Sequence, residues 1–236
     1  MAAPSPRTRV VRLDSPLLVT IDGPAGTGKS SVALALSRRL RASFLDTGAM
    51  YRAAALVTIQ QKIDPTDEAK VVSAVDRADI GFDWDQDPPM VMAMGKAVGT
   101  LIREPEVTRL VSPIATHALL RARMVERQRA VAKLRPRLVT EGRDQGTAVF
   151  PDATVKIYLD AHPAVRAGRR AIQLANAGQA AELSLILRDI LERDWRDENR
   201  AADPLKPAPD AVLVDTSGMT KEGVVDELDK IVRART

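Results

Sequence analysis

A glycine-rich stretch near the amino terminus carries the residues with the clearest chemistry. Residues 23–30 read Gly-Pro-Ala-Gly-Thr-Gly-Lys-Ser and match the pattern G-x-x-x-x-G-K-[ST]. The glycines let successive backbone N–H groups turn toward phosphate oxygens, and the helix expected to begin there adds its positive end. Lys29 would reach the β- and γ-phosphates of a nucleoside triphosphate, and the Ser30 hydroxyl would bind Mg²⁺.

This phosphate-binding loop identifies the donor and leaves the reaction open. We assign to it Gly23, Pro24, Ala25, Gly26, Thr27, Gly28, Lys29, Ser30 and Ser31. A carboxylate at the end of a neighbouring strand is needed to order the water shell of the magnesium ion, and Glu141, which follows an apolar run, is the candidate. A structural or solvated role for Glu141 is the alternative.

The elements that must position this loop alternate between short apolar strands and helices. Strands are expected at 17–21, 44–45, 138–140, 155–159 and 211–214, and helices at 28–41, 48–61 and 220–233. Asp64 is expected to cap a third helix with Pro65 at its first position. This alternation favours a parallel sheet covered by helices on both faces.

The middle of the chain has a different pattern. Residues 79–84, 90–94 and 97–98 predict a small antiparallel meander, with turns at 85–89 and 95–96. A long arginine-rich helical stretch is expected from about 106 to 133. Trp84 and Trp195 are expected to serve in packing rather than as stacking platforms.

Composition narrows the class of protein. The 236 residues are 45% hydrophobic and 28% charged, which excludes wholesale disorder and collagen-like repeats. No run approaches the roughly 18 apolar residues of a membrane helix, and no signal sequence is recognisable at the start, so we expect a soluble, cytoplasmic protein. The absence of cysteine excludes disulfides and thiolate chemistry.

The charge balance leans toward an anionic partner. The net charge is +4, and 26 arginines stand against 9 lysines. The planar fork of arginine suits phosphate and carboxylate groups, although a bias in codon usage would produce the same excess. Only the positions of the arginines can decide between these two interpretations.

Four blocks of sequence resemble, in order and spacing, the signatures of the bacterial cytidylate kinase family. They are DGPAGTGKSS at 22–31, LDTGAMYR at 45–52, EGRDQGTAVFPDA at 141–153 and RDWRDENR at 193–200. The resemblance implies an α/β P-loop NTPase fold: a central parallel sheet with helices on both faces, an acceptor-nucleotide-binding insertion with a small antiparallel sheet, and an arginine-rich helical lid. It also implies a division into a mobile tail (1–14), core (15–57), nucleoside-monophosphate-binding insertion (58–125), core (126–170), lid (171–203) and core (204–236).

The resemblance also implies residue roles. Arg52, Arg143 and Arg200 match positions that clamp the acceptor phosphate, where the arginine fork grips two oxygens. The matches for the base and the ribose are Asp144 for the exocyclic amine, Ser112 and Arg121 for the rest of the ring, and Asp197 for the ribose. The segment before Arg121 departs from the family pattern, with His117-Ala118-Leu119 in place of a proline-containing turn. Asp46, Thr47 and Tyr51 belong to the acceptor block, where Tyr51 either shapes the base pocket or fills the core.

The implied reaction transfers the γ-phosphoryl group of ATP to CMP or dCMP, with Mg²⁺ as cofactor. Such a transfer needs positioning and charge neutralisation more than a strong base, which assigns catalytic roles to Lys29, Arg193 and Arg200. Arg166, Arg169 and Arg170 either approach the transferring group or form a solvated helix face. We expect a monomer acting on small molecules, without a nucleic-acid or membrane partner.

Two alternative functions are consistent with a phosphate-binding loop. Another small-molecule P-loop kinase would use a different monophosphate or a phosphate-free acceptor, and the arginines of the acceptor blocks argue against a neutral one. A nucleotide-switched RNA- or DNA-binding module would fit the basic charge, but aromatic residues make up only 3% of the chain, too few to supply stacking platforms.

Overall fold

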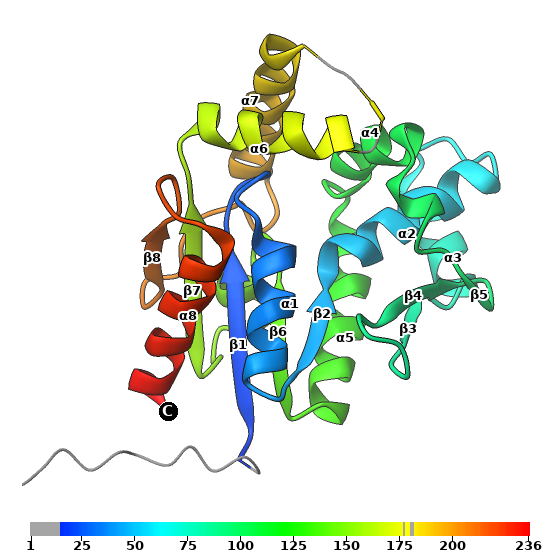
Figure 1. Ribbon diagram of the computed structural model, residues 1–236. Coiled ribbons are helices and arrows are strands. Elements are labelled where there is room, and N and C mark those ends of the chain that lie inside the picture. The colour runs from blue at the N-terminus through cyan, green and yellow to red at the C-terminus, as the bar shows by residue number, and fades with distance from the viewer. Residues whose placement is uncertain (1–14, 177, 180–181) are drawn as a thin grey trace, which may run out of the picture.

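Five parallel strands form the central sheet of the computed structural model, which describes residues 15–176, 178–179 and 182–236 (Figure 1). In spatial order they are β2 (Ser43–Asp46), β6 (Arg137–Glu141), β1 (Leu17–Asp22), β7 (Val155–Asp160) and β8 (Val212–Asp215). Each strand is short and rich in aliphatic residues, as expected where both faces are covered. The predicted parallel sheet is confirmed. The predicted tail, 1–14, falls outside the described residues.

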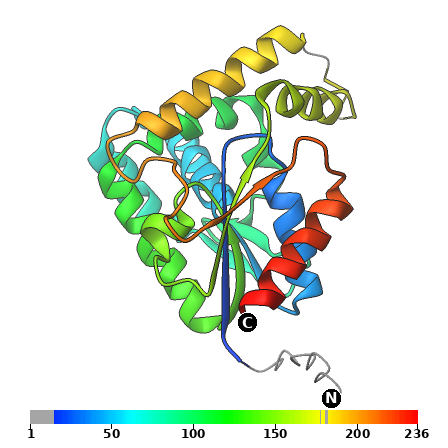
Figure 2. The same ribbon diagram turned by 90° about the vertical axis from the view of Figure 1, so that its left-hand side faces the viewer.

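Helices cover both faces of this sheet, as Figure 2 shows from the side. On one face, α1 (Lys29–Arg39) and α8 (Lys221–Arg235) share a buried cluster that includes Leu36, Leu228 and Ile157. On the other, Leu120 of α5 (Ala118–Leu134) is buried in a second cluster with Leu138 of β6. The loops at the carboxyl ends of the strands therefore stand on a rigid base, which is where open α/β sheets bind ligands.

An insertion lies beyond the β2 edge of the sheet (Figure 1). It begins at the end of α2 (Thr47–Gln60) and contains α3 (Glu68–Arg77) and the predicted meander, an antiparallel sheet of β3 (Gly81–Asp83), β4 (Met90–Ala93) and β5 (Lys96–Ala97). The predicted cap of α3 is wrong: Asp67, not Asp64, accepts a hydrogen bond from the Lys70 backbone N–H, at 3.1 Å. Asp64 instead accepts from the Thr66 N–H in the turn before the helix. Both aspartates have a side chain that can cap a helix, but the helix begins directly after Asp67.

The expected long helix over 106–133 is two helices. After the 3₁₀ turn η1 (Leu101–Arg103), α4 runs over Pro105–Ile114, and α5 begins at Ala118. Between them Thr116 donates its hydroxyl to the Pro113 carbonyl at 2.7 Å, and His117 is extended at the start of α5. The break lets the chain turn back, so that α4 faces the site while α5 packs on the core.

Two helices cross above the carboxyl ends of the strands (Figures 1 and 2). These helices, α6 (Pro163–Asn176) and α7 (Leu183–Asn199), pack through Ala167, Ile186 and Ile190. Trp195 of α7 is 65% exposed, which does not fit the packing role expected for it, whereas Trp84 packs against Phe82 and the core of the insertion. Within the described ranges, none of the helices combines the length and the apolar character of a membrane span.

Candidate active site

The glycine-rich loop connects the central strand β1 to α1. Gly23 has a φ of +145°, and a Cβ there would lie 2.0 Å from the Leu159 carbonyl oxygen, so only glycine fits this contact with β7. Gly28 precedes the first residue of α1 with a φ of +90°, a conformation that side chains disfavour. The loop therefore curls tightly and presents the positive end of α1 to the space above it.

Lys29 lies inside this loop and is almost fully buried. Its Nζ atom donates to the Pro24 carbonyl oxygen at 2.6 Å and to the Thr27 hydroxyl at 3.4 Å. Burial, together with the nearby positive charge of Arg143, lowers the pKa of Lys29 to about 7. An anion bound in the loop would favour the protonated form of Lys29 and would therefore raise its pKa again.

A hydroxyl and two carboxylates gather beside the loop. Ser30 donates its hydroxyl to Oε1 of Glu141 at 2.7 Å, and Glu141 is 4% exposed. Asp46 ends β2 next to Glu141, and burial, followed by the charge of Glu141, raises the pKa of Asp46 to about 7. Hard oxygen ligands with an excess of negative charge suit Mg²⁺, which uses one or two carboxylates together with substrate phosphates. These residues fit the expected metal.

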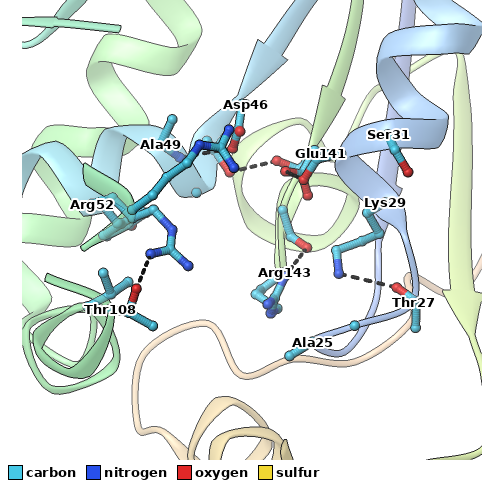
Figure 3. A pocket seen from close by; sticks show the side chains of 18 of the residues that line it. Ala25, Thr27, Lys29, Ser31, Asp46, Ala49, Arg52, Thr108, Glu141 and Arg143 are labelled. Atoms are coloured by element: carbon cyan, nitrogen blue, oxygen red, sulfur yellow. Dashed lines mark hydrogen bonds between the residues drawn. The ribbon is translucent and has the colours of Figure 1, made fainter. Parts of the chain in front are cut away.

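A second set of positive charges faces the loop from the other side (Figure 3). Arg52 of α2 donates from Nη1 to the Thr108 hydroxyl at 2.8 Å and to the Ile102 carbonyl at 3.3 Å. Arg143, after β6, donates from Nε to Asp197 of α7 at 2.9 Å. Burial alone would raise the pKa of Asp197, but Arg143 and Arg193 outweigh it and hold that pKa below its usual value.

Arg193 of α7 differs from the neighbouring arginines in its hydrogen bonding. Among the described residues, its buried Nε atom has no hydrogen-bond partner. Burial and the adjacent Arg143 lower the pKa of Arg193 to about 10. A buried donor without an acceptor is costly, and an anion in the cavity would satisfy it.

The end of the site remote from the loop is built around Asp144. Asp144 is buried and forms a short ion pair with Nη2 of Arg121, a residue of α5 that is 2% exposed. Nη2 of Arg200 lies 3.6 Å from the same carboxylate oxygen, Oδ2. Arg121 also donates from Nε to Asp203 at 3.2 Å. Two arginines and two aspartates thus form one compact, charge-balanced group.

One cavity of about 1670 Å³ connects these groups. It exceeds the roughly 1,000 Å³ upper range of pockets for single small ligands, so it has room for two. Ser112 of α4 and Tyr51 of α2 are on its wall, and Thr47 also lines it, although the Thr47 hydroxyl donates to the Glu141 carbonyl at 2.7 Å. Gly23 and Pro24 are not among its lining residues, which include the other expected site residues: Ala25, Gly26, Thr27, Gly28, Lys29, Ser30, Ser31, Asp46, Thr47, Tyr51, Arg52, Ser112, Arg121, Arg143, Asp144, Arg193, Asp197 and Arg200.

Comparison with known proteins decides the family. The model of the family described as "Cytidylate kinase" matches residues 19–234, nearly the whole chain. The chain belongs to the cytidylate kinase family.

Individual relatives agree over almost the full length. The cytidylate kinase of Corynebacterium efficiens is 46% identical over 221 residues, covering 94% of this chain and 96% of the relative. That of Mycolicibacterium paratuberculosis is 44% identical over 224 residues, covering 95% and 98%. Among solved structures, the shikimate kinase from Bacteroides thetaiotaomicron is 14% identical with a TM-score of 0.45, covering 92% of this chain and 99% of that one.

Two residues in this kinase site, Arg103 and Asp203, were missed by sequence reasoning. Arg103 of η1 lines the cavity, as does Arg170 of α6, and both arginines contribute, after burial, to lowering the pKa of Arg52. Asp203 follows α7 and binds Arg121. Arg103 follows the apolar Ile102, a pairing common on any helical turn, so only the packing of η1 against α2 distinguishes it.

The three arginines that begin α6 have different roles. Arg166 is buried and donates to the carbonyls of Ala161 (2.8 Å) and Ala25 (2.9 Å), and it pairs with Asp194, so it holds the phosphate-binding loop from behind. It does not line the main cavity. Arg169 donates from Nη1 to the Thr216 hydroxyl at 3.0 Å, and both Arg169 and Arg170 line the cavity.

Proposed function

We propose that this member of the cytidylate kinase family transfers the γ-phosphoryl group of ATP to CMP and dCMP, giving ADP and the corresponding diphosphates. The observation that carries the proposal is the single cavity with a phosphate-binding loop at one end, an Asp144–Arg121 pair at the other and arginines between them. That order matches a donor phosphate, an acceptor phosphate and an acceptor base.

The donor end binds the triphosphate of ATP. Backbone N–H groups of the loop and the start of α1 face the phosphates, and Lys29 exchanges its contact with the Pro24 carbonyl for phosphate oxygens. Ser30, with Glu141 behind it and Asp46 beside it, would hold Mg²⁺. When bound, the metal neutralises charge on the donor phosphates.

The acceptor phosphate lies among Arg52, Arg143 and Arg200. Thr108 orients Arg52, and Asp197 orients Arg143, so both forks are held in place before substrate arrives. Preorganised donors of this kind stabilise developing charge without rearranging during the reaction. Arg193 supplies the further donor to the transferring group, supported by its unpaired Nε within the described part of the chain.

The cytosine base contacts the far end. Asp144 accepts from the exocyclic amine, while Ser112 and Arg121 donate to the ring N3 and O2 atoms. A uracil base would present a carbonyl oxygen to Asp144 and leave it without a donor. Asp197 bonds the ribose, and Tyr51 and Thr47 border the base and the acceptor phosphate.

Phosphoryl transfer at this site depends on placement. The chain contributes Lys29, Arg193 and Arg200 as the residues that stabilise charge on the transferring group. We divide the chain as the sequence suggested: a tail (1–14), core segments (15–57, 126–170 and 204–236), an acceptor insertion (58–125) and a lid (171–203). We further infer a monomeric, cytoplasmic enzyme that acts on small-molecule nucleotides.

A coupled assay that follows ADP release over a panel of monophosphates tests the function. CMP and dCMP should be turned over far faster than AMP, GMP, UMP and dTMP at equal concentration. Comparable turnover of AMP or GMP would overturn the base assignment. Salt-dependent binding of single-stranded RNA with no monophosphate turnover would favour the nucleic-acid alternative.

A further inference from the structure

Asp203 lies just after α7 and contacts two of the arginines assigned to the acceptor nucleotide. Its backbone is left-handed, with a φ of +47°, a conformation that aspartate and asparagine tolerate better than most residues. Its carbonyl oxygen accepts from Nε of Arg200 at 2.8 Å, and its carboxylate accepts from Nε of Arg121 at 3.2 Å. One residue therefore fixes two guanidinium groups that come from different elements.

The orientation of Arg121 depends on a small number of partners. Nη2 pairs with Asp144, and Nε and Nη2 each lie 3.2 Å from Oδ2 of Asp203. Nη1 lies 3.4 Å from the Ala115 carbonyl. Because the guanidinium is planar, acceptors at two of its corners define the direction of the whole group. Asp203 holds the edge formed by Nε and Nη2, next to the contact with Asp144.

Asp203 supplies the second negative charge beside the two arginines that approach Asp144. Arg121 and Arg200 both approach Oδ2 of Asp144, so Oδ1 is the oxygen we assign to the exocyclic amine of the base. With Asp203 present, two positive and two negative charges balance. Without it, Asp144 alone would compensate both arginines, and its carboxylate would become a poorer acceptor for the amine.

We propose that Asp203 is a positioning residue that shares the charge of Arg121 with Asp144 and fixes the plane of its guanidinium group, and so sets the affinity for CMP and the preference for cytosine over uracil. This inference rests on the proposed function. The Asp203 side chain is 39% exposed, so we expect a moderate effect rather than loss of the fold.

The substitution Asp203→Asn isolates the charge. Asparagine has the same shape, tolerates the left-handed backbone and keeps one acceptor oxygen. We expect the KM for CMP to rise about threefold to tenfold, in line with the loss of one charged hydrogen bond. The kcat at saturating CMP, the KM for ATP and the melting temperature should stay close to wild type, and the CMP-to-UMP ratio of kcat/KM should fall.

Asp79→Asn is the matched control. Asp79 also has a left-handed backbone, with a φ of +46°, and its carboxylate lies 3.6 Å from Arg127, another arginine of α5. It does not line the cavity, and its replacement should leave every kinetic constant unchanged. Asp203→Glu, which keeps the charge on a longer side chain, should recover part of the lost affinity for CMP.

Two results would overturn the inference. An unchanged KM for CMP and an unchanged CMP-to-UMP ratio in Asp203→Asn would show that Asp203 does not position Arg121. Equal increases in the KM values for CMP and ATP, with a lower melting temperature, would show a structural role only. A failure of the proposed function would be visible in the wild-type enzyme itself, as the absence of a preference for CMP.

Discussion

The Ser30 hydroxyl donates to Oε1 of Glu141 at 2.7 Å and joins the first turn of α1 to the end of β6. The two residues are 111 positions apart and meet because β6 lies next to β1 in the sheet, with Glu141 beside Ile21. This contact brings together the serine of the phosphate-binding loop and the carboxylate expected to organise the metal. It also explains why Glu141 can be buried as a potential anion, since it has a partner.

Glu141→Gln should weaken the use of magnesium. The amide keeps the shape of the side chain and can still accept from Ser30, but it removes the negative charge near the cation. Outer-shell changes of this kind cost about 10- to 100-fold in metal affinity or activity. Kinase activity measured against free Mg²⁺ should show a shift of the midpoint to higher concentration.

Asp160→Asn is the control for this experiment. Asp160 ends β7 as Glu141 ends β6, but its carboxylate accepts from the adjacent Ala161 N–H and does not line the main cavity. Its magnesium midpoint should match that of wild type. An equal shift in both variants would indicate a general effect of charge rather than a contact with the metal.

Asp144→Asn should reduce discrimination against UMP. An asparagine amide can donate to the O4 atom of uracil, which a carboxylate cannot do. Steady-state kinetics should show a lower kcat/KM for CMP and a CMP-to-UMP ratio of kcat/KM that falls by about tenfold, the discrimination that a specific polar contact to a base edge provides. If selectivity is unchanged, Asp144 does not contact the base.

Motif residues were the most predictable part of the site. A glycine-rich loop that ends in Lys29 and Ser30 demands a strand before it and a helix after it, and both are present. The meander was also predictable, because alternation with turn residues on either side has few other solutions. Here local chemistry dictates local structure.

Features that depend on packing could not be predicted. Arg166 and Arg193 are the same residue type on two crossing helices, yet Arg166 is neutralised by Asp194 while Arg193, among the described residues, keeps an unpaired Nε. The break at 115–117 is similar, because helical periodicity continues through it and only the contact of α4 with α2 requires the turn. Such choices are made by tertiary contacts between distant segments.

Asp22 should give the protein a pH-dependent stability. The carboxylate is 4% exposed and accepts from the Gln145 N–H (2.8 Å) and the Gly146 N–H (2.7 Å). Burial outweighs these bonds and raises the pKa of Asp22 to about 7 from the ordinary value of 3.8. A raised pKa means that the folded state favours the protonated form, so this stability is present below about pH 3.8 and is lost as the pH rises to about 7.

Urea unfolding at pH 5, 6, 7 and 8 measures this effect. Relative to Asp22→Asn, the unfolding free energy of the wild type should fall steadily between pH 5 and 7 and level off above that range. Asparagine does not titrate, so it removes the contribution of this position at every pH. A difference that is independent of pH would show that Asp22 is ionised throughout.

Arg193→Met should make the protein more stable and less active. Methionine fills a similar volume without a charge, and it removes the buried Nε that lacks a partner in the described structure. Relief of an unsatisfied buried donor is worth about 1–3 kcal/mol, which thermal unfolding without nucleotide should detect as a higher melting temperature. Loss of an arginine that stabilises the transferring group should lower kcat by about 10³-fold or more. Arg188→Met, at a position of the same helix that is 66% exposed and not on the cavity wall, should change neither quantity by much. A lower melting temperature in Arg193→Met would mean that this guanidinium stabilises the free enzyme and is not an unsatisfied donor that only a bound phosphate satisfies.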